Sequence, residues 1–381
     1  MPLRVISSRI KALIKKHTAE NSTRVASTKK GTKRILVAPL NWGLGHATRC
    51  IPLIYELQKQ GFTPVVASDG QALALLRKEF PTLEAVELPE YNIRYAKKGS
   101  LLTWTLLRQA PKIWKTIILE QRAIENIVKT HQISGIISDN RFGIFHPNLP
   151  SVYITHQLEV LSGFTTWLST RWHQKIIEKF NECWIPDSPG AENLSGKLGH
   201  AQNSKLNIKY IGPLSRFKKQ QIAIQYDIMV LLSGPEPQRQ ILETKLFQQF
   251  KNFKGIVLFV KGLVEPEQRI SQDGTLTIYN YMTSELLERS LNASQVIIAR
   301  SGYTTVMDLA TLEKKAFFIP TPGQLEQNYL AKTLQNQGFA PYCHQDKFDL
   351  EHLKRLKNYT GLKALPSSVN YKSLFRLFER E

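Results

Sequence analysis

The sequence predicts an α/β protein with two domains whose parallel sheets face a central cleft. Short β-branched runs alternate with helical stretches along most of the chain, and this alternation starts a second time near the middle. A length of 381 residues with 42% hydrophobic side chains is enough for two or three domains that each bury a core. These values exclude disordered and fibrous proteins.

The first series of strands begins after a basic tail. Its expected strands are residues 34–39, 64–68, 83–88, 135–139, 151–155, 183–186 and 208–211, with long helices over residues 101–129 and 164–180. Helices between successive strands are typical of a parallel sheet that is covered on both faces.

A second series follows Gly212-Pro213 and a polar, basic stretch without a clear period. Its expected strands are residues 227–232, 256–260, 276–279, 296–299 and 316–319. We therefore predict four regions: a basic tail (1–33), a first domain (34–214), a second domain (215–365) and a C-terminal helix (366–381) that could dock on either domain. A ligand is expected between the carboxyl ends of the two sheets.

The formal charge of +20 favours an anionic partner, such as nucleic acid, a phosphorylated metabolite or an anionic membrane. Residues 1–34 alone carry +9, from ten Lys and Arg against Glu20. This tail could be an amphipathic surface helix, a solvated leader or a transit peptide, and all three interpretations stay open. No zinc finger, helix-turn-helix or RNP-type motif occurs, so we expect no nucleic-acid partner.

The three cysteines, Cys50, Cys183 and Cys343, are far apart and form no C-x-x-C pair. This pattern indicates neither a disulfide framework nor a zinc site, and reduced thiols favour the cytoplasm. No apolar run is long enough for a membrane-spanning helix, so we expect at most a peripheral attachment to the inner face of the membrane. No D-x-D pair occurs, and we expect no metal and no other cofactor.

The first segment that carries chemistry is the turn from Asn41 to Arg49, which follows the first strand and opens a helix. Gly43 and Gly45 let backbone N–H groups approach a ligand, and the start of a helix favours anions. The third glycine of a dinucleotide fingerprint is missing, which argues against NAD. His46 at the mouth of the helix could be a general base or a residue that only caps the helix, and both remain open.

Two turns of the second domain could hold phosphate. Ser233-Gly234 follows a strand and precedes a helix, without the G-K-[ST] of a P-loop, so it could bind a phosphate or be an ordinary turn. Ser301-Gly302, after Arg300, starts another helix and is suited to a diphosphate.

Polar side chains near the second of these turns could bind a sugar nucleotide. Asp308 lies two helical turns further along and could accept from the hydroxyls of a ribose, or be a solvated helix residue. Gln327 and Asn328 follow the next strand, and their amides could bind sugar hydroxyls or simply form a polar helix start.

Together these motifs resemble the GT-B glycosyltransferases, with two Rossmann-like domains, and most closely the MurG-like UDP-N-acetylglucosamine transferases of glycosyltransferase family 28. The resemblance covers residues 34–365. It implies that the first domain takes the acceptor and the second the nucleotide sugar. It also implies that Ser301 and Gly302 lie under the diphosphate and that Asp308 holds the ribose in place of the more usual Glu.

The resemblance implies further site residues in the same way. The sugar hydroxyls are expected at Gln327 and Asn328, and a donor phosphate at Ser233 and Gly234. Gly43, Gly45 and His46 match the glycine-rich loop of the family's first domain. His156-Gln157 is similar to part of the family's His-Glu-Gln-Asn segment. Arg49 and His156 complete the acceptor-side loop.

The implied reaction is an inverting transfer of a hexosyl or N-acetylhexosaminyl group from a UDP-sugar to a lipid-linked or other hydroxyl acceptor. We expect His46 to be the base, with Asp139 as the rival base, and Arg300, Ser301 and Gly302 to receive the diphosphate. Two alternatives stay open. The string formed by Gly43, Gly45, His46 and Arg49 also resembles nucleotide-sugar hydrolases, and the chain could be a non-catalytic nucleotide-sugar-binding protein.

An acceptor carried by a lipid would suit a first domain that lies on an anionic membrane. Basic residues are interleaved with Trp104 and Trp114, which is typical of a membrane-facing surface and also of a solvated face. These basic residues are Arg94, Lys97, Lys98, Arg108, Lys112 and Lys115.

Overall fold

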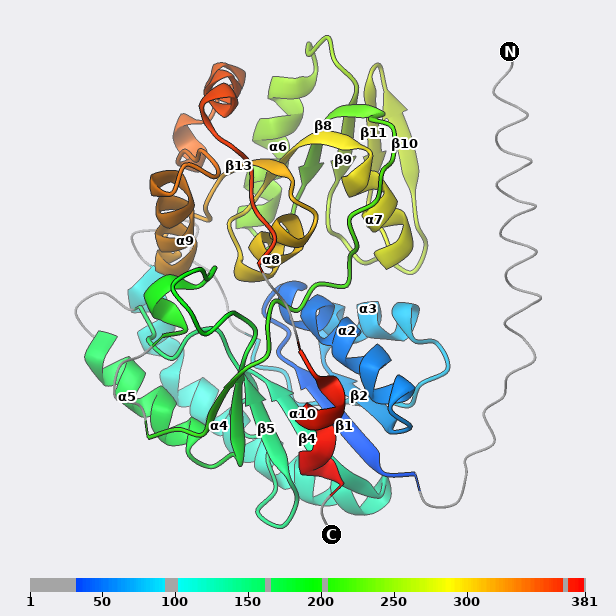
Figure 1. Cartoon of the computed structure of the whole chain (residues 1–381), viewed down its shortest axis with the longest axis vertical. Coiled ribbons are helices and arrows are strands. Elements are labelled where there is room, and N and C mark those ends of the chain that lie inside the picture. The colour runs from blue at the N-terminus through cyan, green and yellow to red at the C-terminus, as the bar shows by residue number, and fades with distance from the viewer. Residues whose placement is uncertain (1–31, 93–101, 162–165, 201–204, 366–368, 380–381) are drawn as a thin grey trace. The chain divides into compact units, whose positions relative to one another are not determined.

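The computed structural model describes residues 32–92, 102–161, 166–200, 205–365 and 369–379, with the backbone only for residues 102–108. The basic tail expected to be an amphipathic helix, a leader or a transit peptide lies outside these residues. Two sheets organise the described chain (Figure 1). They confirm the predicted fold class, an α/β protein with two Rossmann-like parallel sheets.

The first sheet has seven parallel strands among the described residues, in the order β3-β2-β1-β4-β5-β6-β7. They are β1 (Arg34–Pro39), β2 (Thr63–Ser68), β3 (Ala85–Glu87), β4 (Ile133–Asp139), β5 (Ser151–Ile154), β6 (Glu182–Ile185) and β7 (Ile208–Tyr210). β1 and β4 are neighbours, and Pro39 at the end of one pairs with Asp139 at the end of the other. The residues after β1 therefore lie beside the carboxylate of Asp139.

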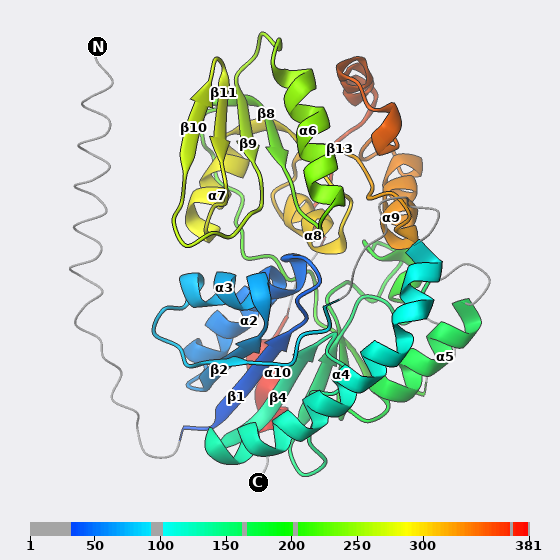
Figure 2. The ribbon, with the colours of Figure 1, turned by 180° about the vertical axis from the view of Figure 1, so that it is seen from behind.

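Helices cover both faces of the first sheet because β1 is apolar on both sides. Ile35 and Val37 pack with α2 (Gly45–Lys59) and α3 (Gly70–Glu79), while Leu36 and Ala38 pack with α4 (Leu102–Thr130). Figure 2 shows α4 in front of the sheet when the molecule is seen from behind. α5 (Thr166–Ile177) packs beside β5 and β6.

The C-terminal helix α10 (Tyr371–Phe375) and the short helix η6 (Arg376–Phe378) return to the first sheet. Leu374 and Phe378 share a buried cluster with Ile35. The ring of Phe378 fills the space that a Cβ on Gly135 of β4 would need. Of the two docking sites left open by the sequence, the helix therefore takes the first domain.

The second sheet has six strands among the described residues, in the order β10-β11-β9-β8-β12-β13. They are β8 (Tyr226–Leu231), β9 (Val257–Val260), β10 (Ile270–Asp273), β11 (Leu276–Tyr279), β12 (Ser294–Ala299) and β13 (Lys315–Phe318). The sequence did not predict β10, which pairs antiparallel with β11 through a turn at Gly274, where φ is 58°. Its four residues are exposed, so it has no apolar face to give a signal.

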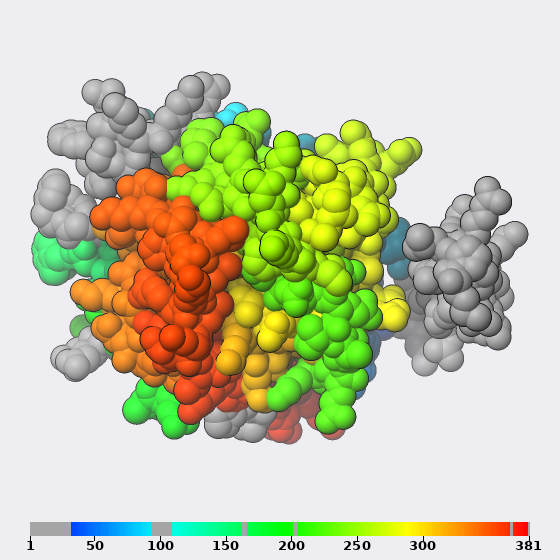
Figure 3. Space-filling view, turned by 90° about the horizontal axis from the view of Figure 1, so that it is seen from above, coloured from blue at the N-terminus to red at the C-terminus, as the bar shows by residue number. Residues whose placement is uncertain are grey.

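The second sheet is also covered on both faces. α6 (Gln238–Phe250) and the 3-10 helix η5 (Leu350–Asn358) pack on one face, and α7 (Ser284–Asn292), α8 (Tyr303–Thr311) and α9 (Leu325–Asn336) pack on the other. Two further 3-10 helices are η3 (Gly196–Leu198) and η4 (Gln345–Lys347). In the space-filling view of Figure 3 the visible face consists mainly of the second half of the chain. No helix within the described residues has the length and apolar character needed to span a membrane.

Candidate active site

Two glycine turns, one from each domain, lie against each other. Gly43 follows β1 with a φ of 81°, a conformation that suits glycine, and a Cβ built on it would lie 3.8 Å from the Cα of Gly234. Gly45 begins α2, and its carbonyl oxygen accepts a hydrogen bond of 3.0 Å from Thr304 Oγ1 at the start of α8. The structure therefore brings the starts of α2 and α8 together.

His46, the second residue of α2, makes a hydrogen bond with the end of β4. Its Nδ1 lies 2.7 Å from Asp139 Oδ1, and its side chain is 16% exposed, whereas that of Asp139 is completely buried. An ionised carboxylate can only accept, so Nδ1 carries the proton and Nε2 keeps its lone pair. Burial lowers the pKa of His46 below 6.5, although Asp139 partly opposes this shift. The imidazole is therefore neutral at pH 7 and able to accept a proton at Nε2.

Asp139 lies behind the imidazole and is held by Arg49. The guanidinium of Arg49, 1% exposed, donates from Nε to Asp139 Oδ2 at 2.5 Å and from NH2 to Oδ1. Burial alone would raise the pKa of Asp139, but the positive charge of Arg49 and the contact with His46 lower it to about 2. Asp139 is thus an ionised, enclosed carboxylate that orients His46.

Arg49 also connects His46 to the second domain. Its NH1 lies 3.0 Å from Nδ1 of His156, whose Nε2 lies 2.7 Å from Glu326 Oε1 in the first turn of α9. The ring of His156 stacks on Tyr303 of α8, with centroids 4.2 Å apart. We call His46, Asp139, Arg49, His156 and Glu326 the base network.

Glu326 is the member of the base network that the sequence did not predict. Gln157 also donates to its carboxylate. The only sequence signal was its position directly before Gln327, and an acid in the first turn of a helix is usually read as a solvated residue that favours the helix dipole.

The turn before α8 has open space beside its glycine. Apart from the glycine and its two chain neighbours, no heavy atom of the described residues lies within 4 Å of the position that a Cβ on Gly302 would take, and the same holds for Gly234, where φ is 105°. Ser301 is completely buried, and its hydroxyl donates to the carbonyl oxygen of Gln327 at 2.8 Å. Ser301 thus shapes the turn, while the two glycines leave its surface open. Ser233 precedes Gly234 and is only partly buried.

The prediction for Arg300 was wrong. We expected it to receive the diphosphate, but its side chain is 1% exposed and donates to the carbonyl oxygens of Ile319, Pro320 and Gln238 and to Gln345 Oε1. Burial lowers its pKa to about 9. The guanidinium joins α6, η4 and the end of β13 inside the second domain, so it cannot contact a diphosphate at Gly302 without breaking these bonds.

Asp308 of α8 faces the linker between the domains. Its Oδ1 accepts a hydrogen bond of 2.7 Å from Ser215, and burial raises its pKa to about 6, against the opposing charge of Arg216. The guanidinium of Arg216 also lies 3.5 Å from Glu79 at the end of α3. The carboxylate expected at a ribose therefore already has a partner in this structure.

Gln327 and Asn328 differ in what their amides do. Gln327 is 8% exposed, and its Oε1 accepts from the backbone N–H of Thr321 at 2.7 Å. Asn328 donates from Nδ2 to Gln324, but its Oδ1 and the hydroxyl of Thr321 are buried and have no partner among the described residues. Buried polar atoms without partners are costly, and a bound ligand is one way to satisfy them.

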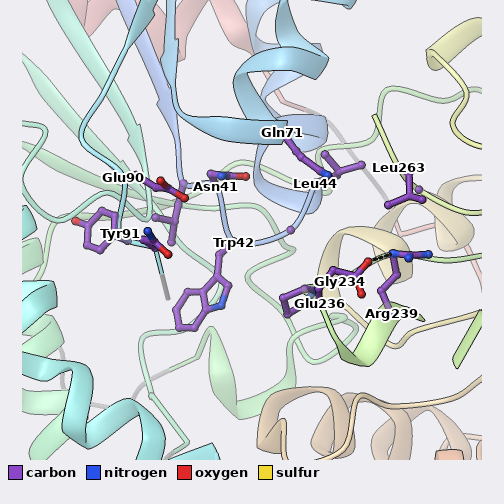
Figure 4. Close-up of a pocket in the computed structure, with 15 residues that line it drawn as sticks. Asn41, Trp42, Leu44, Gln71, Glu90, Tyr91, Gly234, Glu236, Arg239 and Leu263 are labelled. Atoms are coloured by element: carbon purple, nitrogen blue, oxygen red, sulfur yellow. Dashed lines mark hydrogen bonds and ion pairs between the residues drawn. The ribbon is translucent and has the colours of Figure 1, made fainter. Parts of the chain in front are cut away.

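A cavity of about 210 Å³ adjoins Gly43 and Gly234 (Figure 4). Trp42, Asn41 and Tyr91 line it from the first domain, opposite Glu236 and Leu263 of the second. Arg239 also lines the cavity. Its guanidinium donates to Glu236 at 2.6 Å and to Glu243, so these carboxylates neutralise its positive charge. The wall offers aromatic, amide and carboxylate groups.

A second set of buried charges lies beside this cavity, and we call Asp69, Arg141, Glu120 and Tyr91 the Arg141 network. Arg141, which is completely buried, donates to Asp69 and, at 2.8 Å, to Glu120. Glu120 also accepts from the Tyr91 hydroxyl at 2.7 Å, and burial raises its pKa to about 8. In the described part of the chain, no group of three or more His, Cys, Asp or Glu is arranged to hold a metal ion.

Comparisons with known proteins indicate the family of the chain. Residues 238–359 match the glycosyltransferase family 28 C-terminal domain. The chain is 24% identical over 339 residues to the UDP-N-acetylglucosamine--N-acetylmuramyl-(pentapeptide) pyrophosphoryl-undecaprenol N-acetylglucosamine transferase of Haemophilus ducreyi, covering 84% of this chain and 88% of that protein. The chain is a MurG-like glycosyltransferase.

Two further comparisons support a glycosyltransferase and its fold. An uncharacterized glycosyltransferase of Methanopyrus kandleri is 21% identical over 301 residues, covering 75% of this chain and 85% of the relative. The crystal structure of the glycotransferase of kitacinnamycin superposes with a TM-score of 0.57 at 11% identity, covering 85% of this chain and 89% of that one. The MurG-like chain therefore has the GT-B fold.

Proposed function

We propose that this glycosyltransferase transfers a hexosyl or N-acetylhexosaminyl group from a UDP-sugar to a hydroxyl acceptor with inversion. The observation that carries the proposal is the contact between His46 and Asp139. It leaves a neutral imidazole with a free Nε2 lone pair in a partly exposed position beside the starts of α2 and α8. A positioned general base of this kind contributes roughly 10² to 10⁴-fold to a rate.

The reaction is a single displacement. His46 Nε2 removes the proton of the acceptor hydroxyl, and the acceptor oxygen forms a bond to the anomeric carbon. The bond from that carbon to the donor phosphate breaks, and its electron pair leaves with UDP. Because the nucleophile attacks opposite the leaving group, the configuration inverts.

The leaving diphosphate is proposed to lie at Gly302 and Gly234. The open space at both glycines and the N-terminus of α8 support this position, since backbone N–H groups and the helix dipole stabilise negative charge. Asn328 is proposed to bind a sugar hydroxyl through its unpartnered Oδ1. A UDP-sugar donor is supported by the named substrate of the Haemophilus ducreyi relative.

The absence of a D-x-D pair supports a reaction without a metal. We therefore predict that EDTA leaves the rate of transfer unchanged.

The acceptor is proposed to be a lipid or lipid-linked molecule, because α4 and α5 carry large exposed apolar side chains. Trp114 is 54% exposed, Trp167 is 70% exposed and Leu168 is 61% exposed. Phe142 joins the two helices, since it packs against Ile117 and Trp172. Figures 1 and 2 both show α4 and α5 side by side.

Exposed cations accompany these side chains and support a peripheral position on an anionic membrane. They are Lys112, Lys115, Arg171 and Lys175. Arg94, Lys97 and Lys98 of the expected basic surface lie outside the described residues, as do the side chains of Trp104 and Arg108.

We expect W167E/L168E to float less with anionic liposomes at low salt than the wild type. Equal flotation, or flotation without anionic lipid, would argue for a soluble acceptor.

The experiment that tests the function is incubation with UDP-, GDP-, CMP- and dTDP-sugars, with and without lipid extract, while nucleotide release is followed. UDP that appears only with lipid supports transfer. Release with water as the only acceptor would instead support the nucleotide-sugar hydrolase that the turn at Gly43, Gly45, His46 and Arg49 also resembles. Binding without release would support a non-catalytic protein.

A further inference from the structure

We propose that Glu326, a residue of the second domain, is a positioning residue for the base of the first domain and acts through His156 and Arg49. The inference rests on the proposed role of His46 as general base. Its consequence is that the proton-accepting form of His46 depends on contact between the two domains.

Hydrogen-bond direction fixes the state of His156. A guanidinium has donors but no acceptor, so the contact between Arg49 NH1 and His156 Nδ1 requires a bare Nδ1. The proton of His156 must then be on Nε2, where it is donated to Glu326 Oε1 at 2.7 Å. Glu326 therefore selects the one tautomer of His156 that Arg49 can contact.

The position of Arg49 depends on that tautomer. With its NH1 held by His156, Arg49 directs Nε and NH2 at the two oxygens of Asp139. Asp139 in turn holds Nδ1–H of His46. If Glu326 were absent, His156 could place its proton on Nδ1, and two donors would then face each other at Arg49.

Charge leads to the same conclusion. The groups that face His46 are Asp139 of β4, Arg49 of α2, His156 after β5 and Glu326 of α9. With both histidines neutral, the base network carries a net charge of −1, from one cation and two anions. Protonation of His46 brings the net charge to zero, so Glu326 helps to stabilise the imidazolium that forms as the acceptor loses its proton.

Glu326 is itself suited to this role. It lies in the first turn of α9, where the helix dipole favours a carboxylate, and its side chain is 26% exposed. Burial alone would raise its pKa, but the contact with His156 and the positive charge of Arg49 lower it below 4.5. Glu326 is therefore ionised at neutral pH.

The first test needs no activity. In protein labelled with ¹⁵N-histidine, long-range NMR spectra distinguish the two tautomers of each ring, and H156N assigns the signal of His156. We expect His156 to be the Nε2–H tautomer in the wild type and the titration midpoint of His46 to fall by roughly half a pH unit in E326Q. A His156 with its proton on Nδ1, or an unchanged midpoint, would overturn the proposal whether or not the protein transfers sugar.

The second test separates positioning from donor binding. E326Q keeps an oxygen that can accept from His156 but removes the charge, so we expect kcat to fall about tenfold, as for other outer partners of a reactive group. When kcat is plotted against pH, the decrease on the acid side (the acid limb) should move to lower pH. The donor KM should change by less than threefold. E326D, which restores the charge, should recover part of kcat. E285Q is the control, because Glu285 is an exposed acid in the first turn of α7.

A raised donor KM with an unmoved acid limb would mean that Glu326 only binds the sugar, and would contradict the proposal. The same holds if E326Q and E285Q behave alike. Failure of the wild type to release any nucleotide would refute the proposed function, while the tautomer of His156 would still decide the role of Glu326.

Discussion

The base network and the Arg141 network both pair a buried arginine with carboxylates at the same edge of the first sheet. In each, a buried arginine pairs with a carboxylate near the end of β4, and Asp139 and Arg141 are only two residues apart in the chain. The Arg141 network closes on itself, since Tyr91 and the backbone N–H of Gly143 take the remaining bonds of Glu120. The base network instead has two open ends. One end is the unprotonated Nε2 of His46, and the other is Glu326 in the second domain.

The difference shows that burial of an ion pair does not by itself indicate a reactive site. Arg49 gives Asp139 a full counter-charge, and the pKa of Asp139 is lowered to about 2. Arg141 is shared by two carboxylates, and burial raises the pKa of Glu120 to about 8. Only the first arrangement keeps an ionised carboxylate behind a histidine that can accept a proton.

The largest expected effect is that of D139N. We expect kcat to fall about 10³-fold, because the amide can donate to His46 Nδ1 and allow the proton to move to Nε2. The matched variant is D69N, which changes the carboxylate beside Arg141 and should keep kcat within about fivefold. Both are measured as nucleotide release from folded protein at low temperature. Equal losses in the two variants would remove the distinction between the networks.

The next effect is on stability. R141M leaves the buried Asp69 without a counter-charge and removes a hydrogen-bond donor from Glu120, so we expect the free energy of unfolding to fall by about 3–5 kcal/mol. Y91F removes one hydrogen bond from the same network and should cost only about 1 kcal/mol. Denaturant titration followed by tryptophan fluorescence measures both. A loss below about 1 kcal/mol for R141M would show that the Arg141 network does not stabilise the first domain.

A smaller effect than that of R141M concerns Asp308, whose pKa of about 6 in the folded protein lies above the ordinary 3.8. The folded state therefore holds this proton more tightly, so the associated stability is complete below about pH 4 and is lost as the pH rises through 6. D308N should remove this loss and raise stability above pH 6 by about 1–3 kcal/mol. Denaturant titrations at pH 4.5 and 7.5 give the comparison, and an identical pH dependence in both proteins would contradict it.

The same variant tests the proposed ribose contact. If Asp308 turns from Ser215 to a bound nucleotide, D308N should weaken UDP binding severalfold, as measured by calorimetry. Unchanged affinity would remove Asp308 from the donor site.

Much of the fold could be predicted from the sequence, because central parallel strands are buried on both faces and leave continuous apolar runs. Residues 34–39 were predicted as a strand with the bounds that β1 has. β10 was missed because an exposed edge strand has no such run, although the Asp273-Gly274 turn is a recognised hairpin signal.

The site was predicted less completely, for a physical reason. A glycine turn before a helix shows where a ligand can approach, and this drew attention to His46. The sequence did not show which way a side chain at the end of a strand points, and Arg300 points into the second domain. Glu326 was missed because its partner, His156, is 170 residues away in the chain.

The central claim is that His46 accepts the acceptor proton while the second domain holds the donor. Single-turnover release of UDP by H46A, at saturating donor and with lipid extract, tests it most directly. We expect the rate to fall at least about a hundredfold, with the affinity for the UDP-sugar changed by no more than severalfold. Release at the wild-type rate would contradict the account.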